Sequence, residues 1–179
     1  MKNIVYFDLE TQRSIRDVGG DDFIRNLGIS IGVSYSTQTG EYRIYSEKQV
    51  PLLIEELKQA DLVIGYNILR FDYVVLQGYD DFFDYEQLPT LDLMEDLRKT
   101  LQFRLGLDAV ASASLGLEKT SDGLQALKWF KEGKFMEIAE YCCYDVKITK
   151  MVHEFGVNAG QIFFRNRMGL LQAVPVNWQ

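Results

Sequence analysis

Histidine, cysteine and proline are scarce in this sequence, whose 179 residues include one histidine, two cysteines and three prolines. The sole histidine, His153, and the adjacent pair Cys142 and Cys143 have unsuitable spacing for a zinc site of the usual His and Cys type. Adjacent cysteines in a helical pattern point apart, so we expect reduced thiols and no disulfide between them. Zinc binding and a disulfide framework are therefore disfavoured.

Long apolar segments are also lacking. No apolar run reaches about 18 residues, and no basic segment followed by an apolar one comes after Met1. We therefore expect a soluble, cytoplasmic protein without a membrane partner. The length suits a single domain over residues 1–179, in which residues 161–179 form a C-terminal hairpin extension.

Positive charge is in deficit, because 19 Lys and Arg face 26 Asp and Glu for a net charge of −7. At face value this balance argues against a partner made of phosphates. Divalent cations held by clustered acids would reverse the sign locally, however, and basic stripes can persist elsewhere on the surface. The net charge alone does not exclude nucleic acid.

The hydrophobic pattern predicts an α/β fold with a mixed five-stranded sheet, made of an antiparallel meander plus parallel strands and flanked by helices. Residues 12–26 form a polar, basic stretch with no expected element, and the tail alternates like a hairpin around residues 166–169. The expected strands cover residues 3–11, 29–35, 42–45, 61–66 and 89–93, and the expected helices cover residues 51–60, 70–77, 94–101, 107–115, 123–131 and 135–155.

Acidic residues stand where the apolar pattern has no need of them. Asp8 and Glu10 end the first strand, and residues two apart on a strand share a face about 7 Å apart. Tyr141 and Asp145 are four residues apart on the last helix and are therefore neighbours on one face. Asp72 falls near a strand-to-helix junction, where α/β sheets place ligands. A divalent cation is the simplest compensation for such charges, and hard cations prefer oxygen ligands.

Three ordered blocks resemble the ribonuclease H-like DEDD 3′-to-5′ exonucleases, in their tyrosine-containing subgroup. They look most like the proofreading domain of family B DNA polymerases and its stand-alone relatives, and the resemblance runs from Asn3 to about Met151. The subgroup that contains histidine places it five residues before the last aspartate, where this chain has Glu140. The blocks are Phe7-Asp8-Leu9-Glu10-Thr11, Gly65-Tyr66-Asn67-Ile68-Leu69-Arg70-Phe71-Asp72 and Tyr141-Cys142-Cys143-Tyr144-Asp145.

The resemblance implies a role for each matching residue. Asp8, Glu10 and Asp145 would bind one Mg²⁺ or Mn²⁺, and Asp8 would also touch a second ion that Asp72 supports through water. Tyr141 would position the attacking water of an in-line phosphodiester displacement. The residues implied in substrate binding are Thr11, Asn67 and Phe71, the last two at the terminal nucleotide.

Plainer roles stay open for several of these residues. Asn67 is equally typical of a turn, and Phe71 is equally typical of a core. The competing role for Tyr141 is that of a phenol packed at an interface. Asp92 is either a second layer around the site or a helix cap, so we leave it out of the catalytic set. Nine cations could flank a nucleic-acid strand, although a solvated face is the commoner use of such residues. They are Arg13, Arg16, Arg25, Lys119, Lys128, Lys131, Lys134, Lys147 and Lys150.

The function expected from this resemblance is a 3′-to-5′ exonuclease with two metal ions, acting on a free 3′ end, with single-stranded DNA ahead of RNA. One rival is a catalytically silent nucleic-acid-binding or scaffolding domain of the same fold, and another is an endonuclease or structure-specific nuclease. The tail after Gly160 is compatible with docking on a polymerase, on a helicase or on no partner. The oligomeric state is left open.

Overall fold

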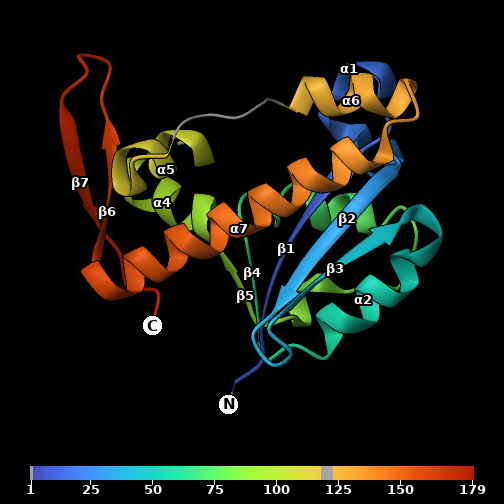
Figure 1. Ribbon diagram of the computed structural model, residues 1–179, viewed down its shortest axis with the longest axis horizontal. Coiled ribbons are helices and arrows are strands. Elements are labelled where there is room, and N and C mark those ends of the chain that lie inside the picture. Colours follow the sequence, from blue (N-terminus) through green and yellow to red (C-terminus); the bar gives the residue numbers. More distant parts are fainter. Residues whose placement is uncertain (1, 118–122) are drawn as a thin grey trace.

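A mixed five-stranded sheet forms the centre of the computed structural model, which describes residues 2–117 and 123–179 (Figure 1). Its strands lie in the order β3-β2-β1-β4-β5. The pairs β1–β2 and β2–β3 are antiparallel, whereas β1–β4 and β4–β5 are parallel, so the predicted sheet is confirmed. The strands are β1 (Ile4–Thr11), β2 (Ile29–Ser36), β3 (Glu41–Ser46), β4 (Leu62–Gly65) and β5 (Thr90–Asp92).

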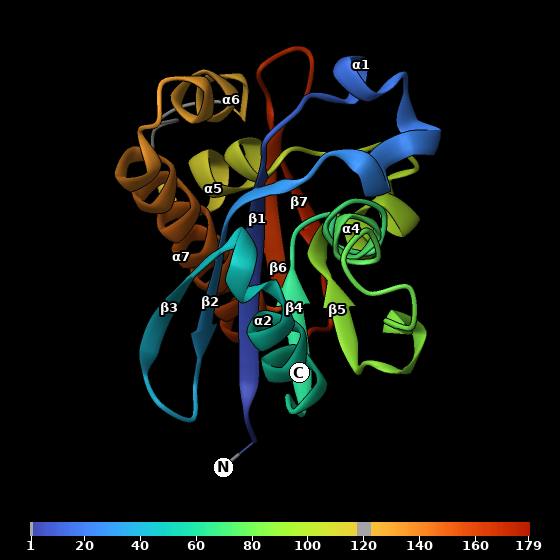
Figure 2. The ribbon, with the colours of Figure 1, turned by 90° about the vertical axis from the view of Figure 1, so that its right-hand side faces the viewer.

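Helices cover both faces of this sheet, and Figure 2 shows α2 on one side with α7 on the other. One apolar core contains residues of α2 and α3, and the other contains residues of α4, α5 and α7. Short 3-10 turns complete the connections. The helices are α1 (Ile15–Val18), α2 (Val50–Lys58), α3 (Asp72–Leu76), α4 (Leu93–Leu101), α5 (Leu107–Leu115), α6 (Gly123–Lys131) and α7 (Phe135–Ala159), and the 3-10 turns are η1 (Asp21–Asn26), η2 (Glu47–Gln49) and η3 (Tyr85–Gln87).

The alternation of side chains along β1 separates the two cores. Val5, Phe7 and Leu9 belong to the core on the side of α2, while Tyr6 belongs to the core on the side of α7. Because successive side chains point to opposite faces, the even-numbered positions after Tyr6 also face α7. The carboxylate-bearing positions of β1 are among them.

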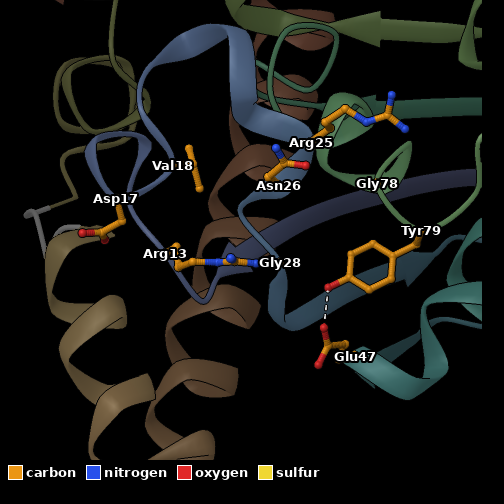
Figure 3. A pocket seen from close by; sticks show the side chains of 9 residues that line it. All are labelled: Arg13, Asp17, Val18, Arg25, Asn26, Gly28, Glu47, Gly78 and Tyr79. Carbon is orange, nitrogen blue, oxygen red and sulfur yellow. Dashed lines mark hydrogen bonds between the residues drawn. The ribbon is translucent and has the colours of Figure 1, made fainter.

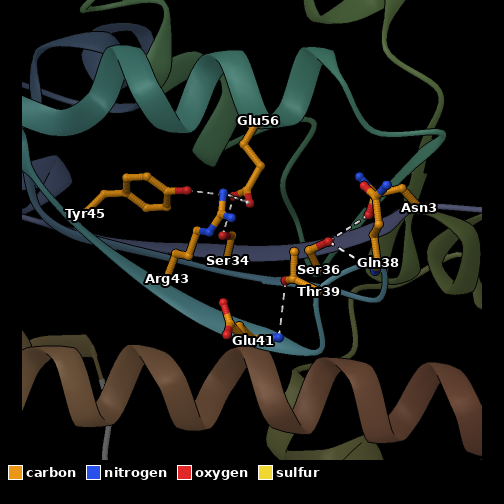
Figure 4. A network of polar contacts seen from close by, with 9 residues as sticks. All are labelled: Asn3, Ser34, Ser36, Gln38, Thr39, Glu41, Arg43, Tyr45 and Glu56. Atoms are coloured by element: carbon orange, nitrogen blue, oxygen red, sulfur yellow. Dashed lines mark hydrogen bonds and ion pairs between the residues drawn. The ribbon is translucent and has the colours of Figure 1, made fainter.

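Glu56 of α2 ties that helix to the meander (Figure 4). Its carboxylate accepts hydrogen bonds from the hydroxyl of Ser34 and from the hydroxyl of Tyr45, the latter at 2.8 Å, and from Arg43 at 3.2 Å. The Glu56 side chain is only 10% exposed, so these donors compensate its desolvation. This acid therefore has a structural role, unlike those at the other end of the sheet.

The predicted C-terminal hairpin is present, and it packs beside α7. It consists of β6 (Gln161–Arg165) and β7 (Leu171–Pro175), which pair antiparallel. Helix α7 extends past the predicted end at residue 155, because Gly156 continues the helix where Trp178 packs against it. The buried ring of His153 donates its Nε2–H to the Trp178 carbonyl (3.2 Å), and its Nδ1 is hydrogen-bonded to Tyr6 Oη (2.9 Å), which fixes this end of the chain.

Two local expectations were incomplete. The stretch 12–26 forms α1 and η1, because Ser14 and Asp17 make a capping box that stabilises a single turn. Helix α3 begins at Asp72 rather than at residue 70, since the preceding residues form a tight turn. None of the described helices combines the length and the apolar character that crossing a bilayer requires.

Candidate active site

Three carboxylates meet where β1 passes under α7. Asp8 and Glu10 lie two positions apart on β1, and Asp145 lies on α7. Each offers an oxygen, and these oxygens all lie within 4.8 Å of one another. Oxygen ligands at such spacing suit a hard divalent cation, so these residues could hold one.

Asp72 lies beside this group but faces the backbone of β1. Its side chain is 3% exposed, and its Oδ1 accepts the Leu9 N–H at 3.0 Å. The pairing of β1 with β4 ends at Tyr6 and Ile64, so Leu9 has no strand partner on that side. Asp72 supplies the missing acceptor, and its carboxylate is thereby held next to that of Asp8.

The electrostatics of these acids are unfavourable when no cation is bound. Burial raises the pKa of Asp8 well above its ordinary value, and the charges of Asp72 and Asp145 raise it further. Burial also raises the pKa of Glu10 well above its ordinary value, with the charge of Asp145 adding to the effect. The pKa of Asp72 rises to about 8 and that of Asp145 to about 6, both mainly through burial. A bound cation would reverse these shifts by favouring the ionised forms.

Tyr141 stands one turn before Asp145 on the same face of α7. Hydrogen bonding from its hydroxyl lowers the pKa of Asp145, against the larger effect of burial. Its ring meets the ring of Trp129 edge to face at 6.4 Å. The pKa of Tyr141 itself is raised, first by burial and then by the charge of Asp145. The phenol therefore keeps its proton at neutral pH and acts as a hydrogen-bond donor.

A strained turn brings Asn67 to the site. Asn67 has φ +70°, a left-handed conformation that few residues other than glycine adopt, and its buried Oδ1 has no partner among the described residues. The Asp92 carboxylate holds this turn by accepting the backbone N–H groups of Asn67 (2.8 Å) and Leu69 (3.0 Å). It also accepts those of Met94 and Glu95 at the start of α4. Asp92 is thus a helix cap and a support of the site at once.

An open cleft of about 570 Å³ extends from the carboxylates. It brings together six of the residues singled out from the sequence, although the Thr11 hydroxyl is already engaged with the Arg13 carbonyl at 2.9 Å. The outer lips carry cations and apolar side chains, including Arg13, Arg16, Ile15 and Leu124. The six expected residues along the cleft are Asp8, Glu10, Thr11, Asn67, Phe71 and Asp72.

The nine candidate cations separate into groups. Arg13 and Arg16 line the cleft, and Arg13 also lines a second hollow of about 540 Å³ together with Arg25 (Figure 3). That hollow contains acids as well, and Arg25 pairs with Asp81.

Two of the remaining cations form ion pairs, Lys134 with Glu132 and Lys150 with Glu154, both at 2.7 Å. Lys134 fits the interpretation of a solvated face, whereas Lys150 is only 23% exposed and lies over the ring of Tyr35. Lys119 lies outside the described residues.

Two further residues contribute to the site and have only weak signals in the sequence. The sequence predicts only a reduced thiol at Cys142; the thiol is free, and its Sγ lies 3.3 Å from the Asp8 carbonyl oxygen and 3.4 Å from Asp8 Oδ2. Its place four residues after Ile138 on the buried stripe of α7 was the available signal. Asp92 was left out of the catalytic set, and its hydrogen bonds to the 67–69 turn are visible only in three dimensions.

Comparisons with known proteins agree with this arrangement. The sequence matches the model of the RNase_H superfamily over residues 5–155. The structure is similar to a family B DNA polymerase from the hyperthermophilic archaeon Pyrobaculum calidifontis, with a TM-score of 0.67 and 14% sequence identity. This similarity covers 88% of the present chain and 25% of the polymerase chain. No protein with a curated description matches the sequence.

Proposed function

The chain belongs to the RNase_H superfamily and has an RNase H-like fold, and from this premise we propose that it is a 3′-to-5′ exonuclease dependent on divalent metal. Its substrate is nucleic acid with a free 3′ end, single-stranded DNA in preference to RNA. The observation that carries the proposal is the convergence of the Asp8, Glu10 and Asp145 oxygens within 4.8 Å at one end of an open cleft. A silent scaffold has no physical need for such a cluster, because it destabilises the fold.

Asp8, Glu10 and Asp145 would hold the first Mg²⁺ or Mn²⁺, and Asp8 with Asp72 would support a second. The donor set fits these ions because it offers carboxylate oxygens whose mutual repulsion a cation relieves. When bound, such ions supply Lewis acidity that activates water and stabilises the leaving oxygen of a phosphodiester. Asp72 would act indirectly, since its Oδ1 is committed to the Leu9 N–H.

Tyr141 would orient the attacking water. Its raised pKa keeps the hydroxyl protonated, so the phenol does not act as a base; it donates its one hydrogen to Asp145, and its oxygen is left to accept a hydrogen bond from a water and hold it in position. The ring of Trp129 and the hydrogen bond to Asp145 limit where that hydroxyl can go. Such positioning matters because a small displacement of the attacking water from the phosphorus lowers the rate of hydrolysis strongly.

The cleft has features that suit a terminal nucleotide. Phe71 is a partly exposed aromatic on which a base can stack. Asn67 offers an unpartnered amide oxygen, which is a suitable acceptor for a donor on the nucleotide. Arg13 and Arg16 at the lip carry charge complementary to phosphate. A polymerase or helicase partner stays a prediction, since the present chain spans only 25% of the similar polymerase.

The decisive experiment follows a 5′-labelled single-stranded DNA 20-mer and a circular single strand in the presence of Mg²⁺, Mn²⁺ or Ca²⁺. We expect a ladder shortened progressively from the 3′ end with Mg²⁺ or Mn²⁺, intact circles, and little turnover with Ca²⁺. Asp8→Asn should lower the rate by about 10³-fold. The exposed Glu41→Gln serves as the matched control and should retain the rate.

Each rival predicts a different result in this assay. Cleavage of the circles would indicate an endonuclease. Absence of turnover with every ion, together with retained binding of the 20-mer, would indicate a silent binding domain. Equal rates for Asp8→Asn and the wild type would refute the assigned site.

A further inference from the structure

We propose that a second cleft, at the C-terminal hairpin, binds the single-stranded nucleic acid on the 5′ side of the nucleotide being removed. This inference rests on the proposed nuclease function and adds a second binding site to it. The cleft, called here the hairpin groove, is lined by Phe103 and Leu105 before α5 and by residues 164–168 and 172 of the hairpin. Its volume is about 520 Å³.

The charge around the hairpin groove is opposite to that of the chain as a whole. Residues 97–107 contain three cations, Arg98, Lys99 and Arg104, and residues 155–179 contain two more, Arg165 and Arg167. Neither segment contains Asp or Glu. Since the whole chain carries −7 and these segments carry +5, the rest carries −12. Asp96 borders the first segment and accepts the Trp178 Nε1–H at 2.8 Å, but the residues that line the groove include no acid, and such a wall in so acidic a protein is complementary to a polyanion.

The arginines of the groove wall are available for phosphate. Arg165 donates to the Gly169 carbonyl at 3.1 Å, which holds it against the turn of the hairpin. Within residues 2–117 and 123–179, neither Arg165 nor Arg167 forms an ion pair. Arg98, by contrast, is paired with Glu95 at 2.6 Å and is not part of the wall. Free guanidinium groups can bind a phosphate through two parallel hydrogen bonds.

Aromatic and apolar surface lies between these charges. The side chain of Phe103 is 46% exposed, and its ring meets that of Phe164 edge to face at 5.8 Å. Met168 at the tip of the hairpin is 77% exposed. Exposed rings next to arginines are the combination by which proteins bind single strands, because bases stack on the rings and phosphates pair with the cations. A purely apolar protein partner would leave Arg165 and Arg167 desolvated without a counter-charge.

The hairpin groove is adjacent to the candidate active site. Tyr66 lines the active-site cleft, and its hydroxyl donates to the carbonyl of Leu105, which lines the groove, at 2.6 Å. The tip of the hairpin and the lips formed by α1 and α6 lie on the same side of the molecule, with α5 between them (Figure 1). A strand with its 3′ end at the carboxylates can therefore continue past Tyr66 into the groove.

Binding of oligonucleotides of two lengths tests the proposal without hydrolysis. The probes are 5′-fluorescein oligothymidylates of 3 and 12 nucleotides, and their anisotropy is followed with the Asp8→Asn protein. Arg167→Glu in that background should weaken binding of the 12-mer at least 10-fold and binding of the 3-mer less than 2-fold. The control Lys48→Glu makes the same charge change on the exposed turn η2 and should alter neither affinity more than 2-fold.

Two further variants separate charge from stacking. Arg167→Ala should reduce the slope of log K against log salt for the 12-mer by about 0.7, the value for one phosphate contact on a single strand. Phe103→Leu keeps apolar packing against Phe164 and should weaken the 12-mer about 5-fold or more through lost stacking. An unchanged melting temperature for each variant shows that the hairpin is intact.

The outcomes of these measurements test the hairpin groove separately from the proposed exonuclease activity. Equal effects of Arg167→Glu and Lys48→Glu would overturn the groove as a nucleic-acid site, whether or not nucleotides are released by the wild type. Equal weakening of the 3-mer and the 12-mer would overturn it as well, since the groove would then not be a separate site. Length-selective weakening in a protein that releases no nucleotides would support the groove and refute the exonuclease.

Discussion

The metal-free protein should lose stability as the pH rises, and Asp72 allows this to be tested at a single position. Asp72 is buried, and its pKa is about 8 in the folded protein against an ordinary value of 3.8. The folded state therefore binds this proton more tightly than the unfolded state does. Its contribution to stability is complete below the ordinary value and is lost as the pH rises through about 8.

The size of the effect follows from the two pKa values. One pKa unit corresponds to 1.36 kcal/mol, so Asp72 alone should lower the free energy of unfolding by on the order of 4 kcal/mol between pH 5 and pH 9. For a chain of this length that corresponds to a fall in melting temperature on the order of 10 °C. His153 has the opposite effect: below pH 6.5, its ordinary pKa, it makes the stability rise with pH, because burial lowers its pKa in the folded protein. The comparison with a variant cancels this second effect.

Asp72→Asn is the informative perturbation, because the amide oxygen can still accept the Leu9 N–H while the ionisable group is gone. The assay is urea unfolding in EDTA at pH 5, 7 and 9, followed by the fluorescence of the two tryptophans. At pH 9 the free energy of unfolding of the variant should exceed that of the wild type by several kcal/mol. It should also change less with pH. Saturating Mg²⁺ should stabilise the wild type at pH 9 more than it stabilises the variant.

Glu41→Gln, on the exposed strand β3, is the control and should follow the wild type at every pH. A wild type as stable at pH 9 as at pH 5 in EDTA would refute the reasoning. So would an Asp72→Asn protein whose stability runs parallel to that of the wild type.

Three further predictions concern single residues. Tyr141→Phe keeps the ring against Trp129 but removes the hydroxyl, so kcat on the DNA 20-mer should fall about 10²-fold with KM nearly unchanged; equal kcat values would contradict the positioning role. Asp92→Ala leaves four backbone N–H groups without their acceptor and should lower the free energy of unfolding by about 3 kcal/mol in urea titrations, whereas Asp92→Asn should recover part of it. Gly156→Ala would place a Cβ 2.3 Å from Trp178 Cε3 and should destabilise by about 2 kcal/mol, while Asn158→Ala on the exposed side of α7 should be neutral in the same measurement.

Strong periodicity made the fold predictable. The apolar run of β1, the meander after it and the long stripe of α7 follow the periods of strand and helix, and each was found close to its expected bounds. The spacing of Asp8 with Glu10, and of Tyr141 with Asp145, likewise determines which side chains share a face. The meeting of these two faces needed the resemblance to a known family, because no local pattern says that α7 crosses β1.

Three details could not be predicted from the sequence. The link from Asp72 to Leu9 exists only because β4 ends at Gly65 while β1 continues. The second role of Asp92 depends on how close the 67–69 turn comes to the start of α4. The single turn α1 was missed because its capping box is a local feature without an apolar stripe.

The difference in length between β1 and β4 links the fold to the chemistry. Past Tyr6, β1 loses its parallel neighbour, and the exposed edge would leave a backbone donor unpaired. The structure fills that edge with the carboxyl group of Asp72, and so adds a fourth acid beside Asp8 and Glu10, one that carries its charge only above about pH 8 or when a cation is bound. An uncharged acceptor would satisfy Leu9 equally well and would not raise the pKa of Asp8. The choice of an acid therefore costs stability in the empty protein and strengthens the attraction for divalent cations, which is what a metal-dependent site requires.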